Sequence, residues 1–196
     1  MTGEAAVRLA RKAVDAKAAG RSVPREEIPP GMESPKGVFV TLSTYPEGDL
    51  RGCIGYPEPV MPMGEAIISS AVSAAGRDPR FSPVTEKETD HITVEVTLLT
   101  VPERIDVPKS ELPSKIVIGR DGLILSCRGN RGLLLPQVPG EWGWDQEEYL
   151  AQLSVKAGLP PDAWRRPDAE IQWFRGTVFA EETPRGKVSE VMSRTL

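Results

Sequence analysis

The chain has 196 residues, with one histidine (His91), two cysteines (Cys53 and Cys127) and a formal net charge of −4. One histidine cannot build a histidine-rich zinc site, and two cysteines cannot hold a four-thiolate zinc site or an iron–sulfur cluster unaided. We therefore expect no metal and no cofactor. The acidic balance gives no support to nucleic-acid binding, and no stretch reaches the ~20 apolar residues of a membrane span. We expect a cytoplasmic protein without membrane contact.

The first half of the chain predicts two helices and three strands. Residues 2–19 carry an apolar stripe at helical spacing, and residues 64–75 repeat the same i, i+4 pattern. Residues 37–43 and 50–55 are separated by a Tyr-Pro-Glu-Gly-Asp turn and predict a hairpin. In residues 91–101, Ile, Val and Leu alternate with Thr and Glu, which predicts a strand with one buried face.

The second half predicts short strands and one helix. Asp145 with Glu148 resembles an N-terminal capping pair and opens a helix to about residue 157. The last residues, 184–196, are polar and predict a tail without regular structure. Strands are expected at 116–118, 122–127, 131–135 and 171–180. Because helices do not alternate with strands and several connections are hairpins, the sequence predicts an α+β fold with antiparallel sheets and packed helices.

The hexapeptide Leu-Arg-Gly-Cys-Ile-Gly at residues 50–55 is the most informative segment. In a strand, Arg51 and Cys53 project to one side about 7 Å apart, and a guanidinium that near favours the thiolate of a partly exposed cysteine. Gly52 and Gly55 leave open backbone that a ligand or another chain can approach. The alternative is structural, because cysteine packs as a small hydrophobe and strand glycines often mark crowded packing.

Three other groups could carry chemistry, and each also has a structural interpretation. His91 and Glu95 share a polar strand face and could transfer a proton, or His91 is an ordinary surface residue. Asp78 and Arg80 form either a structural ion pair or charges presented to a cleft. Cys127 shares a strand face with two leucines, which favours core packing.

Trp142 and Trp144 flank Gly143 just before the helix expected at Asp145. Two tryptophans beside a flexible glycine can form a stacking platform for a planar ligand. They can equally pack over the helix start as a hydrophobic staple. The glycine-rich phosphate loops of common nucleotide-binding proteins do not occur in the chain, and neither does Gly-x-Ser-x-Gly.

The hexapeptide at residues 50–55 resembles the signature of the AMMECR family. The resemblance covers roughly residues 4–182 and is similar in layout to the prokaryotic, single-domain members. It implies a two-part α+β fold within residues 1–183, with a larger part from both chain ends, a smaller part from the middle and the signature strand near the groove between them. Further segments resemble family blocks in the same order: 78–81 (Asp-Pro-Arg-Phe), 92–100, 133–138, 141–145 and 156–159.

Three positions depart from the family pattern. Asp121 stands where many relatives carry histidine, and Ser154 stands where many carry cysteine. A mechanism that needs either of those residues is therefore not expected here. Thr89 stands where leucine is usual, which is expected to alter packing only.

The resemblance supplies no agreed reaction, but it implies association with Memo-like and radical-SAM proteins. We expect first a module that binds a ligand or protein and works with such a partner enzyme. One alternative is an enzyme that uses Cys53 as a nucleophile, with Arg51 favouring its thiolate. Another is a structural adaptor whose signature only packs. The expected groove has Arg51 and Cys53 as its floor, with Leu50, Gly52, Ile54, Gly55, Asp78, Arg80, Glu95, Trp142 and Trp144 as further lining residues.

Overall fold

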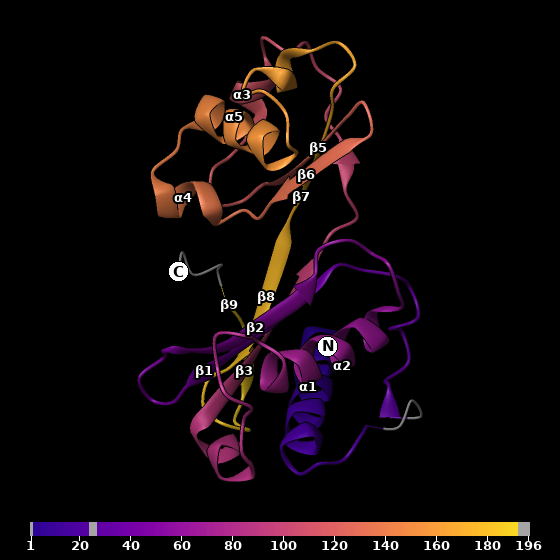
Figure 1. Ribbon diagram of the computed structural model, residues 1–196. Helices are drawn as coiled ribbons and strands as arrows, with labels where there is room; N and C mark the ends of the chain where they lie inside the picture. The colour runs from indigo at the N-terminus through magenta and orange to yellow at the C-terminus, as the bar shows by residue number, and fades with distance from the viewer. Residues whose placement is uncertain (1, 24–26, 192–196) are drawn as a thin grey trace. The chain divides into compact units, whose positions relative to one another are not determined.

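The computed structural model describes residues 2–23 and 27–191 and contains helices with two antiparallel sheets (Figure 1). The α+β class expected from the sequence is therefore confirmed. The chain divides into two compact units, each with its own sheet and core. The first unit takes the chain up to Leu99 and again from Thr177, and the second takes Thr100–Gly176.

The first unit is built on a five-stranded sheet. The expected hairpin forms the β1–β2 pair, and β1 also pairs with β3, so β1 lies inside the sheet while β2 is an edge strand. Residues of β3 alternate between buried and half-buried, as the Ile/Val and Thr/Glu alternation predicted. The strand order is β2 (Leu50–Tyr56), β1 (Val38–Thr44), β3 (Ile92–Leu99), β8 (Gly176–Glu181) and β9 (Val188–Val191).

Two helices cover one face of this sheet, α1 (Thr2–Ala18) and α2 (Met63–Gly76). The apolar stripe of α1 is buried as its spacing predicted, and it packs with the Val and Leu side chains of β1 and β3 that point the same way. A 3-10 helix, η2 (Glu86–His91), leads into β3. The opposite sheet face carries the alternate side chains of β1 and β3, which are mostly Thr, Ser and Glu.

The second unit is built on a four-stranded sheet in the order β4 (Glu103–Arg104), β7 (Glu170–Phe174), β5 (Gly122–Cys127) and β6 (Asn130–Leu134). The expected cap at Asp145 is confirmed, because its side chain accepts a hydrogen bond from the backbone N–H of Glu148 at the start of the longest helix. Cys127 is buried in this unit's core, as its leucine neighbours indicated. The helices are α3 (Leu112–Lys115), α4 (Val138–Trp142), α5 (Gln146–Lys156) and the 3-10 helix η3 (Ala163–Arg165).

Three expectations about elements are wrong. Residues 116–118 form no strand, because the backbone of Val117 bonds within a turn that Asp121 closes. The single strand expected over 171–180 is two strands, β7 and β8, which belong to different sheets and meet at Arg175. The expected tail contributes strand β9 to the first sheet, while residues 192–196 lie outside the described part of the chain.

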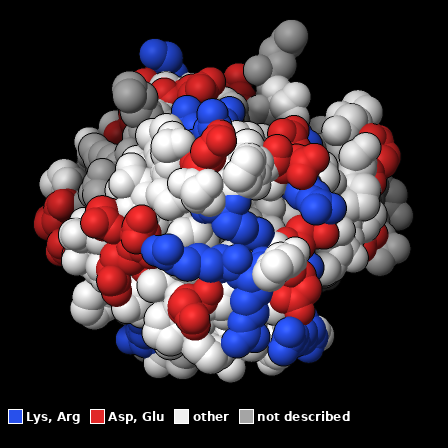
Figure 2. Space-filling view, turned by 90° about the horizontal axis from the view of Figure 1, so that it is seen from above, with Lys and Arg blue, Asp and Glu red and all other residues white. Residues whose placement is uncertain are grey.

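On the face shown in Figure 2, Lys and Arg side chains lie among Asp and Glu side chains. Among the residues that the structure describes, no helix combines the length and apolar composition that a membrane crossing requires.

Candidate functional site

The signature strand β2 contains a β-bulge at Arg51. Leu42 of β1 pairs with Gly52, but the next residue of β1, Ser43, pairs with Leu50, so Arg51 is the extra residue. A bulge breaks the alternation of side chains and re-aims the extra residue. The expectation that Arg51 and Cys53 project together from regular strand therefore does not hold.

Arg51 is bound to the 3-10 helix that precedes β3. Its Nε and Nη2 donate to Oε1 of Glu88 at 3.1 and 3.0 Å, and its guanidinium lies 5.8 Å from the ring centre of Phe81. Burial raises the pKa of Glu88, but hydrogen bonds from Thr85 and Arg51 outweigh burial and leave that pKa below its usual value. Nη1 of Arg51 is buried without a hydrogen-bond partner among the described residues. Arg51 therefore joins β2 to η2.

Cys53 lies in a row of polar side chains across three strands. Thr41 of β1 is the register partner of both Cys53 and Glu95, and its hydroxyl donates to Sγ of Cys53 at 3.3 Å. Burial raises the pKa of Cys53, and the opposing effects of Thr41 and Arg80 do not offset it. The nearby cation that acts on the thiol is Arg80, so the expectation of a thiolate favoured by Arg51 is wrong.

Asp78 and Arg80 clamp the exposed edge of β2. Oδ2 of Asp78 accepts the backbone N–H of Cys53 at 2.9 Å, and Nη2 of Arg80 donates to the carbonyl oxygen of Cys53 at 3.4 Å. Arg80 also donates to both oxygens of Asp78, and this contact holds the pKa of Asp78 well below its usual range. The pair thus supplies the donor and acceptor that a further strand would offer. The Asp-x-Arg spacing after a helix end was the available signal for this role.

The two glycines of the signature face protein, not open space. A Cβ on Gly52 would lie 2.4 Å from the carbonyl oxygen of Ala74 in α2. A Cβ on Gly55 would lie 2.3 Å from the carbonyl oxygen of Val38 and would overlap the Phe39 ring. The expectation of open backbone for a ligand is therefore wrong, since both glycines permit close packing. Ile54 likewise packs against the first core, while Leu50 is half-buried.

The structure brings Arg51, Cys53, Asp78, Arg80 and Glu95 together in the first unit. His91 ends η2 and is exposed, so it does not lie on the strand face that was expected to hold it with Glu95. Within residues 2–23 and 27–191, no three His, Cys, Asp or Glu side chains converge as metal ligands would.

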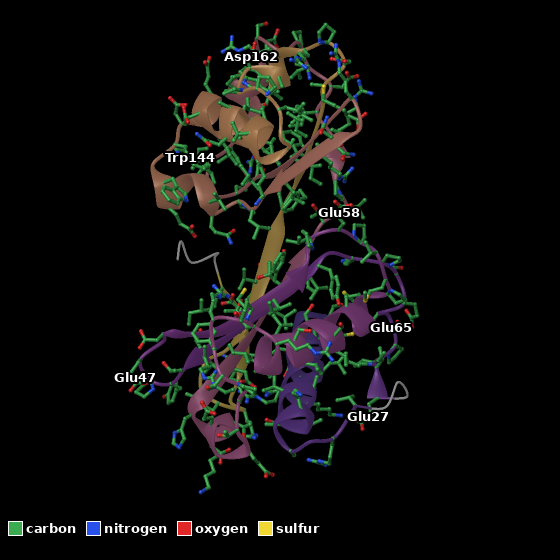
Figure 3. The ribbon with its side chains drawn as sticks, viewed as in Figure 1. Glu27, Glu47, Glu58, Glu65, Trp144 and Asp162 are labelled. Atoms are coloured by element: carbon green, nitrogen blue, oxygen red, sulfur yellow. The ribbon has the colours of Figure 1, made fainter. Side chains whose placement is uncertain are left out.

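The two expected tryptophans lie in the second unit: Trp142 is the last residue of α4, and Trp144 follows two residues later (Figure 3). Trp142 and Trp144 stack with ring centres 6.1 Å apart and ring planes 17° apart. Trp144 packs against the core of this unit, as a hydrophobic staple would, whereas Trp142 is 70% exposed. Gly143 makes this geometry possible with a φ of 68°, which other residues adopt only with strain.

The family departures occupy structural positions. Asp121 is fully buried and accepts hydrogen bonds from Arg120, Arg175 and the backbone of Val117. The hydroxyl of Ser154 donates to the carbonyl of Leu150 and accepts the backbone N–H of Trp164. The hydroxyl of Thr89 donates to the carbonyl of Glu86. Each polar side chain is therefore satisfied within the fold, and the hydroxyl of Thr89 also accepts a hydrogen bond from Arg185, so its role is not packing alone as was expected.

Comparison with known proteins gives concordant matches over nearly the whole chain. The family model AMMECR1 matches residues 7–179. A protein of Thermococcus gammatolerans is 53% identical over 191 residues, covering 95% of this chain and 93% of its own length. Protein MJ0810 of Methanocaldococcus jannaschii is 53% identical over 190 residues, covering 96% and 94%. The crystal structure of the uncharacterized protein PH0010 from Pyrococcus horikoshii matches with a TM-score of 0.79 and 48% identity over 97% of both chains.

Proposed function

This chain belongs to the AMMECR1 family, and we propose that it is a cytoplasmic binding module whose recognition surface is the polar sheet face around Cys53. The names of these relatives state no activity, so the proposal depends on the site itself. The observation that carries it is the row Cys53–Thr41–Glu95, in which burial keeps the thiol protonated. A protonated, half-buried thiol suits binding better than nucleophilic attack.

The row offers the half-buried Cys53 and Glu95 to a ligand, while Thr41 between them is buried and hydrogen-bonds the thiol. Side chains opposite one another on adjacent strands lie about 5 Å apart, so Cys53, Thr41 and Glu95 span a length suited to a small polar molecule or an extended peptide. The guanidinium of Arg80 is about half exposed at the edge of β2 and adds a cation next to the row. Arg51 acts from the bulge as a positioning residue, because it fixes β2 against η2.

The proposal also includes a partner enzyme. A Memo-like or radical-SAM partner is implied by the family resemblance, and the polar row is where we place the ligand or peptide that such a partner would share with this chain. The structural-adaptor alternative is favoured by one observation, the contacts of Gly52 and Gly55 with neighbouring protein. Those contacts account for two signature residues but leave Cys53 and Glu95 half-buried on the polar face.

An NMR fragment screen tests the proposal. The isotope-labelled protein is titrated with a library of small polar fragments, and amide shifts are mapped onto the chain. We expect shifts to cluster at residues 39–43 and 93–97 and at Cys53, and Cys53→Ala with Thr41→Val to abolish them. Cys127→Ala is the matched control, because that cysteine is buried in the other unit's core and should not alter the hits. Amide shifts located away from this face, or shifts that remain unchanged in the double variant, would refute the proposal.

A further inference from the structure

The second unit carries an aromatic surface that the proposed function does not use. Trp142 stacks on Trp144, which is anchored in the core, so one ring face of Trp142 is supported and the side chain still remains 70% exposed. The αL conformation of Gly143 and the hydrogen bond from Trp144 N–H to the Pro139 carbonyl fix the backbone between the two rings. The exposed tryptophan is therefore held in place before anything binds to it.

The chain segment that carries this pair has only negative charges. Residues 132–155 contain four carboxylates and no lysine or arginine, a local charge of −4 that equals the net charge of the whole chain. All four carboxylates, Glu141, Asp145, Glu147 and Glu148, belong to exposed residues. Glu147 is bound by Arg165 at 2.9 Å, while Glu141 and Asp145 directly flank the two tryptophans in the sequence. The carboxylates that flank Trp142 in the sequence therefore favour a cationic partner there.

The other two tryptophans of this unit each have an arginine guanidinium over the ring. The guanidinium of Arg165 lies 4.5 Å from the ring centre of Trp164, and that of Arg175 lies 5.4 Å from the ring centre of Trp173. Among the described residues, no guanidinium lies over the ring of Trp142 or Trp144 in this way. A cation over a tryptophan face is attracted by the ring quadrupole, and nearby carboxylates add to that attraction.

We propose that Trp142, supported by Trp144 and flanked by Glu141 and Asp145, is the docking surface for an arginine-containing segment of a partner protein. The guanidinium stacks on the open face of Trp142, and the carboxylates pair with it or with neighbouring basic residues. This inference stands apart from the proposed function, since it concerns the other unit and needs neither Cys53 nor Glu95.

The test uses fluorescence anisotropy with the full-length protein. The probe is a short fluorescein-labelled peptide of alternating glycine and arginine, with glycine–lysine and glycine–glutamate counterparts. We expect the arginine peptide to bind more tightly than the lysine peptide, the glutamate peptide not to bind, and Trp142→Ala to weaken binding at least about five-fold. Glu141→Gln with Asp145→Asn should weaken binding and flatten its salt dependence, and asparagine at 145 still caps α5.

Val155→Ala is the matched control, because Val155 is another exposed apolar residue of the second unit, at 49% exposure, and its loss should leave binding unchanged. Equal binding by wild type and Trp142→Ala would overturn the proposal and indicate charge attraction alone. Saturable binding of adenosine monophosphate that depends on Trp142, without binding of the arginine peptide, would instead identify a site for planar ligands. A dimer that depends on Trp142 without any peptide, seen by sedimentation velocity, would identify a second copy of this chain as the occupant.

Discussion

The thiol of Cys53 accepts a hydrogen bond from Thr41 and lies near Arg80, and both groups lower its pKa. Burial raises that pKa by more than the two groups lower it. We therefore expect Cys53 to react slowly with iodoacetamide at neutral pH, with a rate that is still rising at pH 9. Thr41→Val should slow alkylation at pH 8 by about two- to ten-fold, because a lost hydrogen bond of ~0.5–1.5 kcal/mol raises the thiol pKa by up to ~1 unit.

The measurement uses a Cys127→Ser background, so that mass spectrometry reports Cys53 alone. Arg80→Gln should slow the reaction in the same direction, since it removes the cation that acts on the thiol. Rapid alkylation with a plateau below pH 8 would show a thiolate, and it would revive the nucleophile hypothesis for Cys53.

The sequence was sufficient to single out the residues of this site, but not to assign their partners. Alternation correctly put Cys53 on the other face of β2 from Gly52 and Ile54, because period-2 spacing is a local property. The bulge at Arg51 depends on how β2 pairs with β1, which the hexapeptide alone does not encode. The contacts of Asp78 and Arg80 with Cys53 likewise join segments some 25 residues apart in the chain.

At the scale of elements, the edge of β2 depends on the Asp78–Arg80 clamp. Asp78→Asn should lower the free energy of unfolding by about 2 kcal/mol at pH 7, because the buried carboxylate loses its charge-assisted bonds to Arg80. The folded pKa of Asp78 lies below its unfolded value of ~3.9, so its stabilisation is complete above that value and is lost as the pH falls. The difference between wild type and variant in urea unfolding should therefore shrink below about pH 4.

Asp90→Asn is the control for this measurement. Asp90 also pairs with an arginine, Arg185, but its side chain is 75% exposed, so its replacement should change stability by less than about 0.5 kcal/mol. An equal cost for the two variants, or a cost for Asp78→Asn that does not vary with pH, would contradict the clamp.

A buried ion pair joins α1 to β8 in the first unit. Arg11 and Glu181 are bound to each other with side chains 5% and 0% exposed, and Arg11 also donates to the carbonyls of Thr89 and Ile92. Glu181→Gln should cost about 3–5 kcal/mol, since it leaves the buried guanidinium with only the longer contact to Asp15 at 3.7 Å. Arg11→Met with Glu181→Leu should cost less than the single change, as measured by urea unfolding followed by circular dichroism.

The exposed pair Lys12–Glu27 provides the comparison, and Lys12→Gln should change stability by less than about 1 kcal/mol. A double variant that costs more than Glu181→Gln would show that Arg11 and Glu181 act through other partners. The stripe on α1 was readable from the sequence, but the burial of Arg11 within that helix was not, because its partner lies 170 residues away.

At the scale of the whole molecule, local patterns predicted the α+β class and most helices and strands, since apolar periodicity is written in each segment. The assignment of strands to sheets was not predicted, because β8 and β9 join the first sheet by pairing with segments distant in the chain. Sheet membership also explains the error over residues 171–180. That apolar run was predicted as one strand, but it forms β7 in one sheet and β8 in the other.

The second unit is a continuous segment with a closed core, and we expect residues 100–176 to fold when expressed alone. Its sheet, its buried Asp121 network and its core helix α5 all lie within that range. Its ends are already adjacent, because the backbone N–H of Thr100 donates to the carbonyl of Arg175 at 2.8 Å. All four tryptophans belong to this segment, so their fluorescence reports on its folding directly.

We expect dispersed amide resonances and a cooperative urea transition for the fragment, with tryptophan emission like that of the full chain. Leu150→Ala is the paired control, because Leu150 is fully buried in this core and its truncation should cost about 2–5 kcal/mol, enough to unfold so small a domain. A fragment with collapsed resonances and no transition would contradict the expectation. It would mean that burial within residues 100–176 does not by itself offset the entropy of ordering that segment.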